Sequence, residues 1–171
     1  MIILLGFPKS GTTSFTFLLN KLGYKSYHWV YRNDTDYIGS WIKKCKERNE
    51  KLLSFLPVQK KPIAITQMDV CVDKNNSYWP QLVDYELLYE QYPEAIFILN
   101  TRNPVDILKS MKKWQEYNER MFLFNPELFD GLTGTKDEKI IKLIQNHFNN
   151  VTEFFKSKKN SKFIRYHIIN D

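Results

Sequence analysis

The sequence predicts an α/β protein: a three-layer sandwich with a mostly parallel central sheet and a P-loop-like strand–loop–helix unit at its N-terminus. Short apolar segments alternate with segments of helical periodicity, and this alternation is typical of a parallel sheet with helices on both faces. The segment 96–101 is almost entirely apolar, as expected for a central strand buried on both faces. The apolar residues 1–5 run into a turn bounded by Gly6 and Gly11, which indicates the N-terminal unit.

A helix is predicted directly after this turn, and Gly23 is its expected end. Its apolar residues recur at i, i+3, i+4 and i+7, which predicts one buried face: Phe15, Leu18, Leu19 and Leu22. A second strand is expected over 24–30. Asp34 or Thr35 is then predicted to cap another helix, whose apolar face is Ile38, Trp41, Ile42 and Cys45.

The middle of the chain is predicted to continue the alternation. A third strand is expected over 63–66, an irregular loop over 67–79 and a short helix over 84–92. After the strand at 96–101, Asn103 is positioned to cap a helix whose first residue is Pro104, the position at which proline is favoured. The buried side of that helix is predicted to be Ile107, Leu108, Met111 and Trp114.

A long helix and a last strand complete the predicted fold. Thr135 and Glu138 have the spacing of a capping box, and the helix they open has this predicted core face: Ile141, Ile144, Phe148, Val151 and Phe155. The final strand is expected over 163–169. A length of 171 residues and the absence of an internal repeat or linker composition predict a single domain over 1–171.

Composition narrows the protein class. A hydrophobic content of 43% and an aromatic content of 15% are typical of a packed globular protein and exclude a disordered one. The net charge of +6 favours anionic partners. The two cysteines, Cys45 and Cys71, have no metal-site spacing and form no disulfide framework, so no metal is expected. No apolar run is long enough for a signal-peptide core or a membrane span, so we expect a soluble cytoplasmic protein.

The turn from Gly6 to Gly11, here called the phosphate loop, departs from the pattern of nucleotide hydrolases. That pattern requires lysine directly after the second glycine, where this chain has Thr12. The only lysine in the loop is Lys9, three residues earlier. One cation, several hydroxyls and the free amides of a helix start suit a terminal phosphate or sulfate better than a magnesium-bound triphosphate.

The loop resembles that of the sulfotransferase superfamily. The segment Pro8-Lys9-Ser10-Gly11-Thr12-Thr13-Ser14 is similar to the family's 5′-phosphosulfate loop. A second segment, 96–110, resembles the family's 3′-phosphate segment, in which a strand ends in arginine and a serine follows eight residues later; here these are Arg102 and Ser110. The resemblance covers roughly two thirds of the chain.

This resemblance implies a donor and a reaction. The donor is 3′-phosphoadenosine 5′-phosphosulfate (PAPS), and the product is adenosine 3′,5′-bisphosphate (PAP). Lys9 would bridge the 5′-phosphate and the departing sulfuryl group, Ser10 to Ser14 would bind the phosphate, and Arg102 with Ser110 would bind the 3′-phosphate. The structural alternatives are a solvated loop lysine for Lys9 and, for Arg102, an ion-pair partner of Asp106 or of a neighbouring carboxylate.

The general base has two candidates. An attacking acceptor must lose a proton, and a histidine or carboxylate normally takes it. Asp69 follows the third strand, near the place where cytosolic members of the family have a histidine, and is the first candidate. His28, at the end of the second strand, is the other. Their structural alternatives are a loop or capping aspartate for Asp69 and a packed histidine beside Trp29 for His28.

The sequence therefore predicts a PAPS-dependent sulfotransferase. Its acceptor would be a hydroxyl or amine on a small molecule or glycan, reached by in-line displacement, with no nucleic acid and no membrane as partner. Two alternatives remain open. One is a nucleotide or small-molecule kinase, which the missing lysine at position 12 argues against; the other is a non-catalytic nucleotide-binding module.

Overall fold

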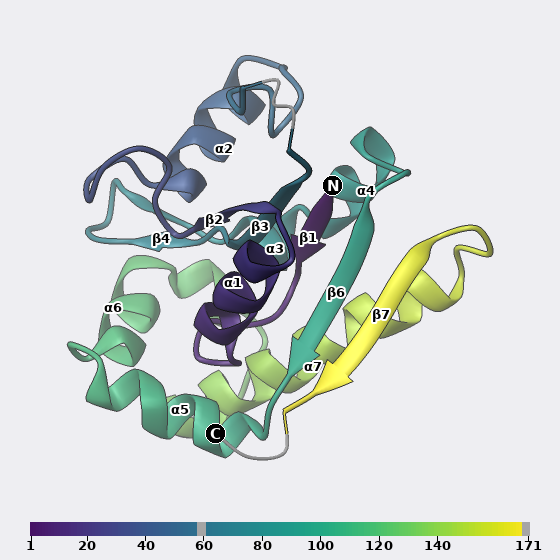
Figure 1. The fold of residues 1–171 in the computed structure, drawn as a ribbon. Helices are drawn as coiled ribbons and strands as arrows, with labels where there is room; N and C mark the ends of the chain where they lie inside the picture. The colour runs from purple at the N-terminus through teal and green to yellow at the C-terminus, as the bar shows by residue number, and fades with distance from the viewer. Residues whose placement is uncertain (58–60, 169–171) are drawn as a thin grey trace.

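A computed structural model describes residues 1–57 and 61–168 of the chain. Its centre is a five-stranded parallel sheet with the strand order β2-β3-β1-β6-β7 (Figure 1). The strands of this sheet are β1 (Ile2–Leu4), β2 (Lys25–His28), β3 (Ile63–Gln67), β6 (Ile96–Thr101) and β7 (Lys162–His167). A parallel central sheet flanked by helices confirms the predicted α/β class.

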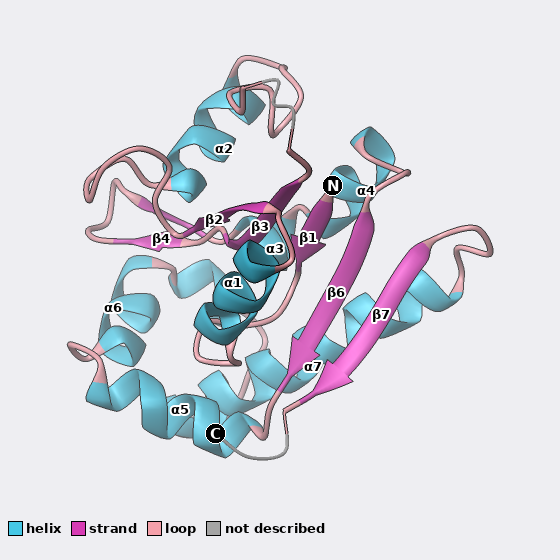
Figure 2. Cartoon of the chain, viewed as in Figure 1, coloured by secondary structure: helices cyan, strands magenta, loops and turns pink. Residues whose placement is uncertain are grey.

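Helices follow the strands in alternation, as Figure 2 shows. The helices are α1 (Thr12–Lys21), α2 (Ile38–Glu47), α3 (Pro80–Val83), α4 (Tyr85–Gln91), α5 (Pro104–Lys113), α6 (Tyr117–Phe124), the 3-10 helix η1 (Pro126–Phe129) and α7 (Lys136–Lys156). The predicted loop 67–79 also contains an antiparallel hairpin of β4 (Val70–Cys71) and β5 (Ser77–Tyr78). The helix predicted over 84–92 is α4, and α3 before it was not predicted.

The two faces of the sheet bury different amounts of apolar surface. Alternate residues of a strand point to opposite faces, and in β1 Ile3 joins the large core while Ile2 and Leu4 join a small one. The large core packs α2, α5 and α7 against one face. The small core lies under α1, which contacts β2 and β3 on the other face (Figure 1).

Helix α1 corrects the prediction of its buried face. Of the four apolar residues expected to pack, Leu19 is buried, but Leu18 is 50% exposed and Leu22 is 63% exposed. The stripe that meets the sheet is instead polar near the phosphate loop. Thr12 is buried there, and the Thr16 hydroxyl contacts that of Thr66 in β3. The Thr12 hydroxyl donates to Gln67 and the Thr16 hydroxyl meets that of Thr66, so this polar stripe is satisfied where it meets the sheet. Of the predicted residues, Leu19 and the partly buried Phe15 pack on the small core, and Leu18 and Leu22 stay exposed.

The start of α2 also differs from the prediction. Its N-cap residue is Tyr37, and neither Asp34 nor Thr35 caps it. The Asn33 side chain accepts a hydrogen bond from the Thr35 backbone, a local turn that uses this polar group before the helix begins. The buried residues of α2 include three of the four that were predicted, namely Ile38, Ile42 and Cys45.

The caps of α5 and α7 confirm the sequence signals. The Asn103 side chain accepts from the Val105 backbone at 2.9 Å, with Pro104 as the first residue of α5. Thr135 and Glu138 form the predicted capping box of α7. In α7, Ile140 is buried in place of the predicted Ile141. The last strand ends at His167, and Ile169 of the predicted strand lies outside the described residues.

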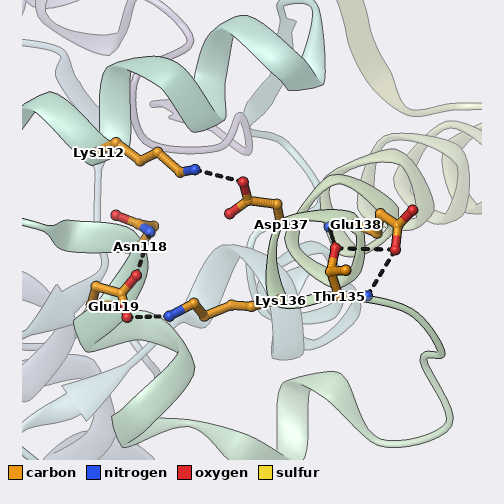
Figure 3. A network of polar contacts seen from close by, with 7 residues as sticks. All are labelled: Lys112, Asn118, Glu119, Thr135, Lys136, Asp137 and Glu138. Atoms are coloured by element: carbon orange, nitrogen blue, oxygen red, sulfur yellow. Dashed lines mark hydrogen bonds and ion pairs between the residues drawn. The ribbon is translucent and has the colours of Figure 1, made fainter.

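Ion pairs attach the N-terminus of α7 to α5 and α6. Figure 3 shows Lys112 of α5 paired with Asp137, and Lys136 paired with Glu119 of α6. Exposed pairs of this kind contribute about 1 kcal/mol or less each. Their role is therefore to orient helices that the apolar core already holds against the sheet.

Candidate functional site

The phosphate loop is a tight turn between β1 and α1. Lys9 and Gly11 both have left-handed backbone conformations, with φ of 70° and 79°. The Ser10 backbone N–H donates to the Phe7 carbonyl at 3.1 Å and closes the turn. Gly11 is the N-cap of α1 and has no side chain to cap it. The amides of the first turn of α1 are therefore available to an anion, at the positive end of the helix dipole.

Asn100 of β6 holds this loop in place. Its Nδ2 donates to the Ser10 carbonyl at 2.8 Å and to Ser10 Oγ at 2.7 Å, and its Oδ1 accepts from the Gly6 N–H at 3.2 Å. A Cβ at Gly6 would lie 2.2 Å from Asn100 Oδ1, so this contact requires glycine. Sequence reasoning missed Asn100; the signal was one amide within an otherwise apolar, buried strand.

A cavity of about 990 Å³ opens beside the loop. The predicted site residues that line it are Lys9, Gly11, Thr12, Thr13, Ser14, His28, Arg102 and Ser110. Pro8, Ser10 and Asp69 are not among its described lining residues. Ser10 is instead buried against Asn100 and supports the loop from within. The two motifs, which are about 90 residues apart in the sequence, thus share one cavity.

Lys9 and Arg102 are connected directly. Arg102 Nη1 donates to the Lys9 carbonyl at 3.0 Å. The Lys9 ammonium lies 4.0 Å from the centre of the Trp114 ring, a cation–π contact. Burial lowers the pKa of Lys9, and the negative charge of Asp69 partly opposes this effect. A partly desolvated ammonium has lost some of its water, so an anion that enters the cavity gains a strong partner.

His28 faces the same cavity from the end of β2. Its Nε2 lies 3.3 Å from Thr13 Oγ1, and its Nδ1 lies 3.2 Å from Thr66 Oγ1. Burial, together with the positive charge of Lys9, lowers the pKa of His28 to about 4. The imidazole is therefore neutral at pH 7 and has one nitrogen able to accept a proton.

Asp69 is not among the described residues that line the cavity. Its side chain is fully buried, and it accepts hydrogen bonds from Tyr117, from Gln81 at 3.1 Å and from Gln67 at 3.3 Å. Burial raises the pKa of this carboxyl, against the hydrogen bonds that lower it. Gln67 does line the cavity and accepts from the Thr12 hydroxyl at 3.0 Å. Asp69 thus reaches the site through the Gln67 amide.

Aromatic and aliphatic side chains form the rest of the cavity wall. Near Lys9, the rings of Trp29 and Trp114 meet edge to face, 5.5 Å apart. Trp29 has a left-handed backbone with φ of 64°, a strained conformation for a bulky residue. On the sheet side, Phe15 meets Tyr166 of β7 at 5.7 Å. Trp29 and Tyr166 were not predicted as site residues, because no sequence spacing marks either one.

Residues 1–57 and 61–168 contain no group of three or more His, Cys, Asp or Glu side chains placed to hold a metal ion. They also contain no helix that is both long enough and apolar enough to cross a membrane. Cys45 and Cys71 are both buried and unpaired.

Comparison with known proteins identifies the family of the chain. No curated protein sequence matches it significantly. A family model described as a sulfotransferase domain matches residues 1–170. That match spans nearly the whole chain and includes both the phosphate loop and the segment that ends in Arg102. The chain therefore belongs to the sulfotransferase domain family.

Proposed function

We propose that this protein is a PAPS-dependent sulfotransferase that acts on a hydroxyl group. The observation that supports the proposal most directly is the shared cavity of Lys9 and Arg102. Two cations in one cavity, one beside the N-terminus of α1, fit a donor with an anionic group at each end. When bound, PAPS supplies the sulfuryl group and PAP is its leaving group.

The residues present fit such a donor. The first-turn amides of α1 and the hydroxyls of Thr13 and Ser14 offer hydrogen bonds at the loop. Arg102 is suited to a phosphate dianion, which its planar guanidinium grips with two bonds. Ser110 lines the same cavity from α5. We therefore assign the 5′-phosphosulfate to the loop and the 3′-phosphate to Arg102 and Ser110.

Lys9 is the residue that we assign to stabilise the leaving group. Its ammonium would meet the negative charge that develops on the leaving oxygen during sulfuryl transfer. A cation fixed in a partly dry site stabilises that charge without reorganisation of water. The left-handed backbone at Lys9 and the hydrogen bond from Arg102 to its carbonyl hold the lysine at the apex of the loop.

His28 is the group that we assign as general base. It lines the cavity, it is neutral at pH 7, and its Nε2 is directed towards Thr13 at the loop. Asp69 is fully buried against Tyr117, Gln81 and Gln67. We therefore propose that Asp69 orients Gln67 and that His28 takes the proton from the acceptor.

The charge of the cavity favours a hydroxyl acceptor over an amine. Its described lining residues include Lys9 and Arg102 but no aspartate or glutamate. An alkyl amine is protonated at pH 7, and this cavity would repel it. The walls formed by Trp29 and Trp114 provide flat apolar surfaces, which suit a small ring-containing molecule or a sugar. The same lack of carboxylates leaves no group to hold magnesium, so a kinase is less well supported.

Ligand-induced stabilisation followed by an activity assay tests this proposal. A ligand that binds only the native state raises the melting temperature. We expect PAP to raise it, and ATP with magnesium or a nucleic-acid oligomer to have less effect. Transfer of labelled sulfate from PAPS to a panel of hydroxyl acceptors should then be measured.

Matched variants make the test specific. Lys9→Ala should abolish transfer, whereas Lys21→Ala should not, because Lys21 is an exposed lysine at the C-terminal end of α1, far from the phosphate loop. A larger rise in melting temperature with magnesium ATP than with PAP would favour a kinase. Binding of PAP without transfer to any acceptor would favour a non-catalytic nucleotide-binding module.

A further inference from the structure

A chain of hydroxyl groups connects His28 to the backbone beneath it. His28 Nδ1 lies 3.2 Å from Thr66 Oγ1. Thr66 Oγ1 also lies 3.1 Å from the Tyr27 carbonyl and 2.6 Å from Thr16 Oγ1. The Thr16 hydroxyl in turn lies 2.9 Å from the Thr12 carbonyl. Thr66 is fully buried, so water does not compete for its hydroxyl.

The two hydroxyls have fewer hydrogens than they have contacts. A hydroxyl has one hydrogen, and a carbonyl oxygen only accepts. The two hydroxyls therefore supply two hydrogens for four contacts. If His28 carries its proton on Nδ1, a third hydrogen enters the chain and three of the contacts become hydrogen bonds. If Nδ1 is bare, at most two of them are made.

The opposite side of the ring does not offset this difference. Nε2 lies 3.3 Å from the Thr13 hydroxyl, which donates when Nε2 is bare and accepts when it is protonated. That contact is made with either tautomer. The Nδ1-protonated ring therefore has one more hydrogen bond, which favours this tautomer.

We infer that Thr66 is a positioning residue that fixes the tautomer of His28, with the proton on Nδ1 and a bare Nε2 facing the cavity. The inference rests on the proposed role of His28 as general base. A base must present its lone pair to the acceptor hydroxyl, and Thr66 selects the tautomer that does so. An incoming acceptor hydroxyl then replaces the Thr13 hydroxyl as the donor to Nε2.

His147 provides an internal reference with the opposite tautomer. Its Nε2 lies 2.7 Å from the Leu5 carbonyl, which only accepts, so this ring must carry its proton on Nε2. Burial lowers the pKa of His147 to about 4, as it does for His28. Both rings are neutral at pH 7, and the same spectrum can compare their tautomers.

Nitrogen NMR of the ¹⁵N-histidine-labelled protein tests the inference without substrate. Long-range proton–nitrogen correlations at pH 7 distinguish the two tautomers, and a His28→Asn spectrum assigns the signals of His28. We expect His28 to be protonated on Nδ1 and His147 on Nε2. A wild-type His28 protonated on Nε2 would overturn the inference.

Two substitutions at position 66 complete the test. Thr66→Val keeps the shape but cannot accept, so the proton should move to Nε2 and kcat should fall at least about tenfold with little change in KM for PAPS. Thr66→Ser restores an acceptor and should restore both the tautomer and most of kcat. An unchanged tautomer in Thr66→Val would contradict the inference, and melting curves identify a variant that fails to fold.

These experiments test the tautomer of His28 and its role as general base independently. An Nδ1-protonated ring in wild type that shifts in Thr66→Val supports the positioning role of Thr66 even if His28→Asn retains transfer activity. In that case the assignment of His28 as the base is wrong and the tautomer assignment stands.

Discussion

The guanidinium of Arg102 donates a hydrogen bond to the backbone carbonyl of Lys9 at 3.0 Å. This bond joins the end of β6 to the apex of the phosphate loop. It links the only two lysine or arginine residues among the described lining residues of the cavity. It also holds Lys9 in a left-handed backbone conformation that lysine rarely adopts. Arg102 thus supports the loop as well as lining the cavity.

Replacement of Arg102 should weaken nucleotide binding even when the charge is kept. Arg102→Lys retains one positive charge but loses the two-pronged grip on phosphate. We expect it to weaken PAP binding about tenfold, and Arg102→Ala to weaken it about a hundredfold, as measured by calorimetry. Arg48→Ala removes an exposed arginine at the end of α2 and serves as the control. Equal affinity for PAP in wild type and Arg102→Ala would rule out the assigned 3′-phosphate site.

His28 and Asp69 should respond differently to substitution by asparagine. His28→Asn removes the assigned base, so kcat should fall about a hundredfold or more while the protein stays folded. Asp69→Asn replaces an acceptor of three hydrogen bonds with a group that cannot accept all three. Its main effect should be a loss of about 1–3 kcal/mol in the free energy of unfolding. A larger fall in kcat for Asp69→Asn than for His28→Asn would reverse the assignment.

The activity should persist at acid pH. Burial and the charge of Lys9 lower the pKa of His28 to about 4, so the neutral, basic form remains dominant well below the usual histidine range. The profile of kcat/KM, which reports the free enzyme, should therefore lose activity on its acid side near pH 4. An acid limb near pH 6.5 would mean that the base is a histidine with an ordinary pKa.

The stability of the protein should also fall on acidification because of His147. Its pKa is about 4 in the folded protein against 6.5 as the ordinary value. Between these two pKa values the unfolded protein binds more protons than the native protein. The free energy of unfolding therefore decreases as pH falls from 7 towards 4. From pH 7 to pH 5 the loss from this one group is about 2 kcal/mol.

Urea titrations at these two pH values measure that loss. His147→Gln keeps a donor for the Leu5 carbonyl but does not titrate. Its stability should therefore vary less with pH than that of wild type. A variant with the same pH dependence as wild type would show that His147 is not the group responsible.

Asn100 should matter for stability more than any exposed amide. Asn100→Ala removes three hydrogen bonds to the phosphate loop and leaves the Gly6 N–H and the Ser10 carbonyl without this partner. We expect a loss of about 3 kcal/mol in the free energy of unfolding, measured in urea. Asn150→Ala, at an exposed position on α7, should change it by less than about 0.5 kcal/mol.

The sequence was sufficient for the features that depend on local chemistry. The glycine-bounded turn, the cap at Asn103 and the capping box at Thr135 each arise from residues within a few positions of one another. The same is true of the nearly all-apolar strand 96–101. The alternation of strands and helices predicted the parallel sheet, and two short motifs predicted the family.

Contacts between residues that are distant in the sequence could not be predicted from it. Asn100 against Gly6, Arg102 against the Lys9 carbonyl and Asp69 behind Gln67 join segments whose spacing in the sequence carries no signal. The packing of α1 shows the same limit: of the four apolar residues predicted to be buried, Leu18 and Leu22 are exposed, and the threonines Thr12 and Thr16 meet the sheet beside Leu19. Which side of a helix is buried depends on the surface opposite it. That surface exists only after the strands have assembled, because burial and hydrogen bonding act through space and not along the chain.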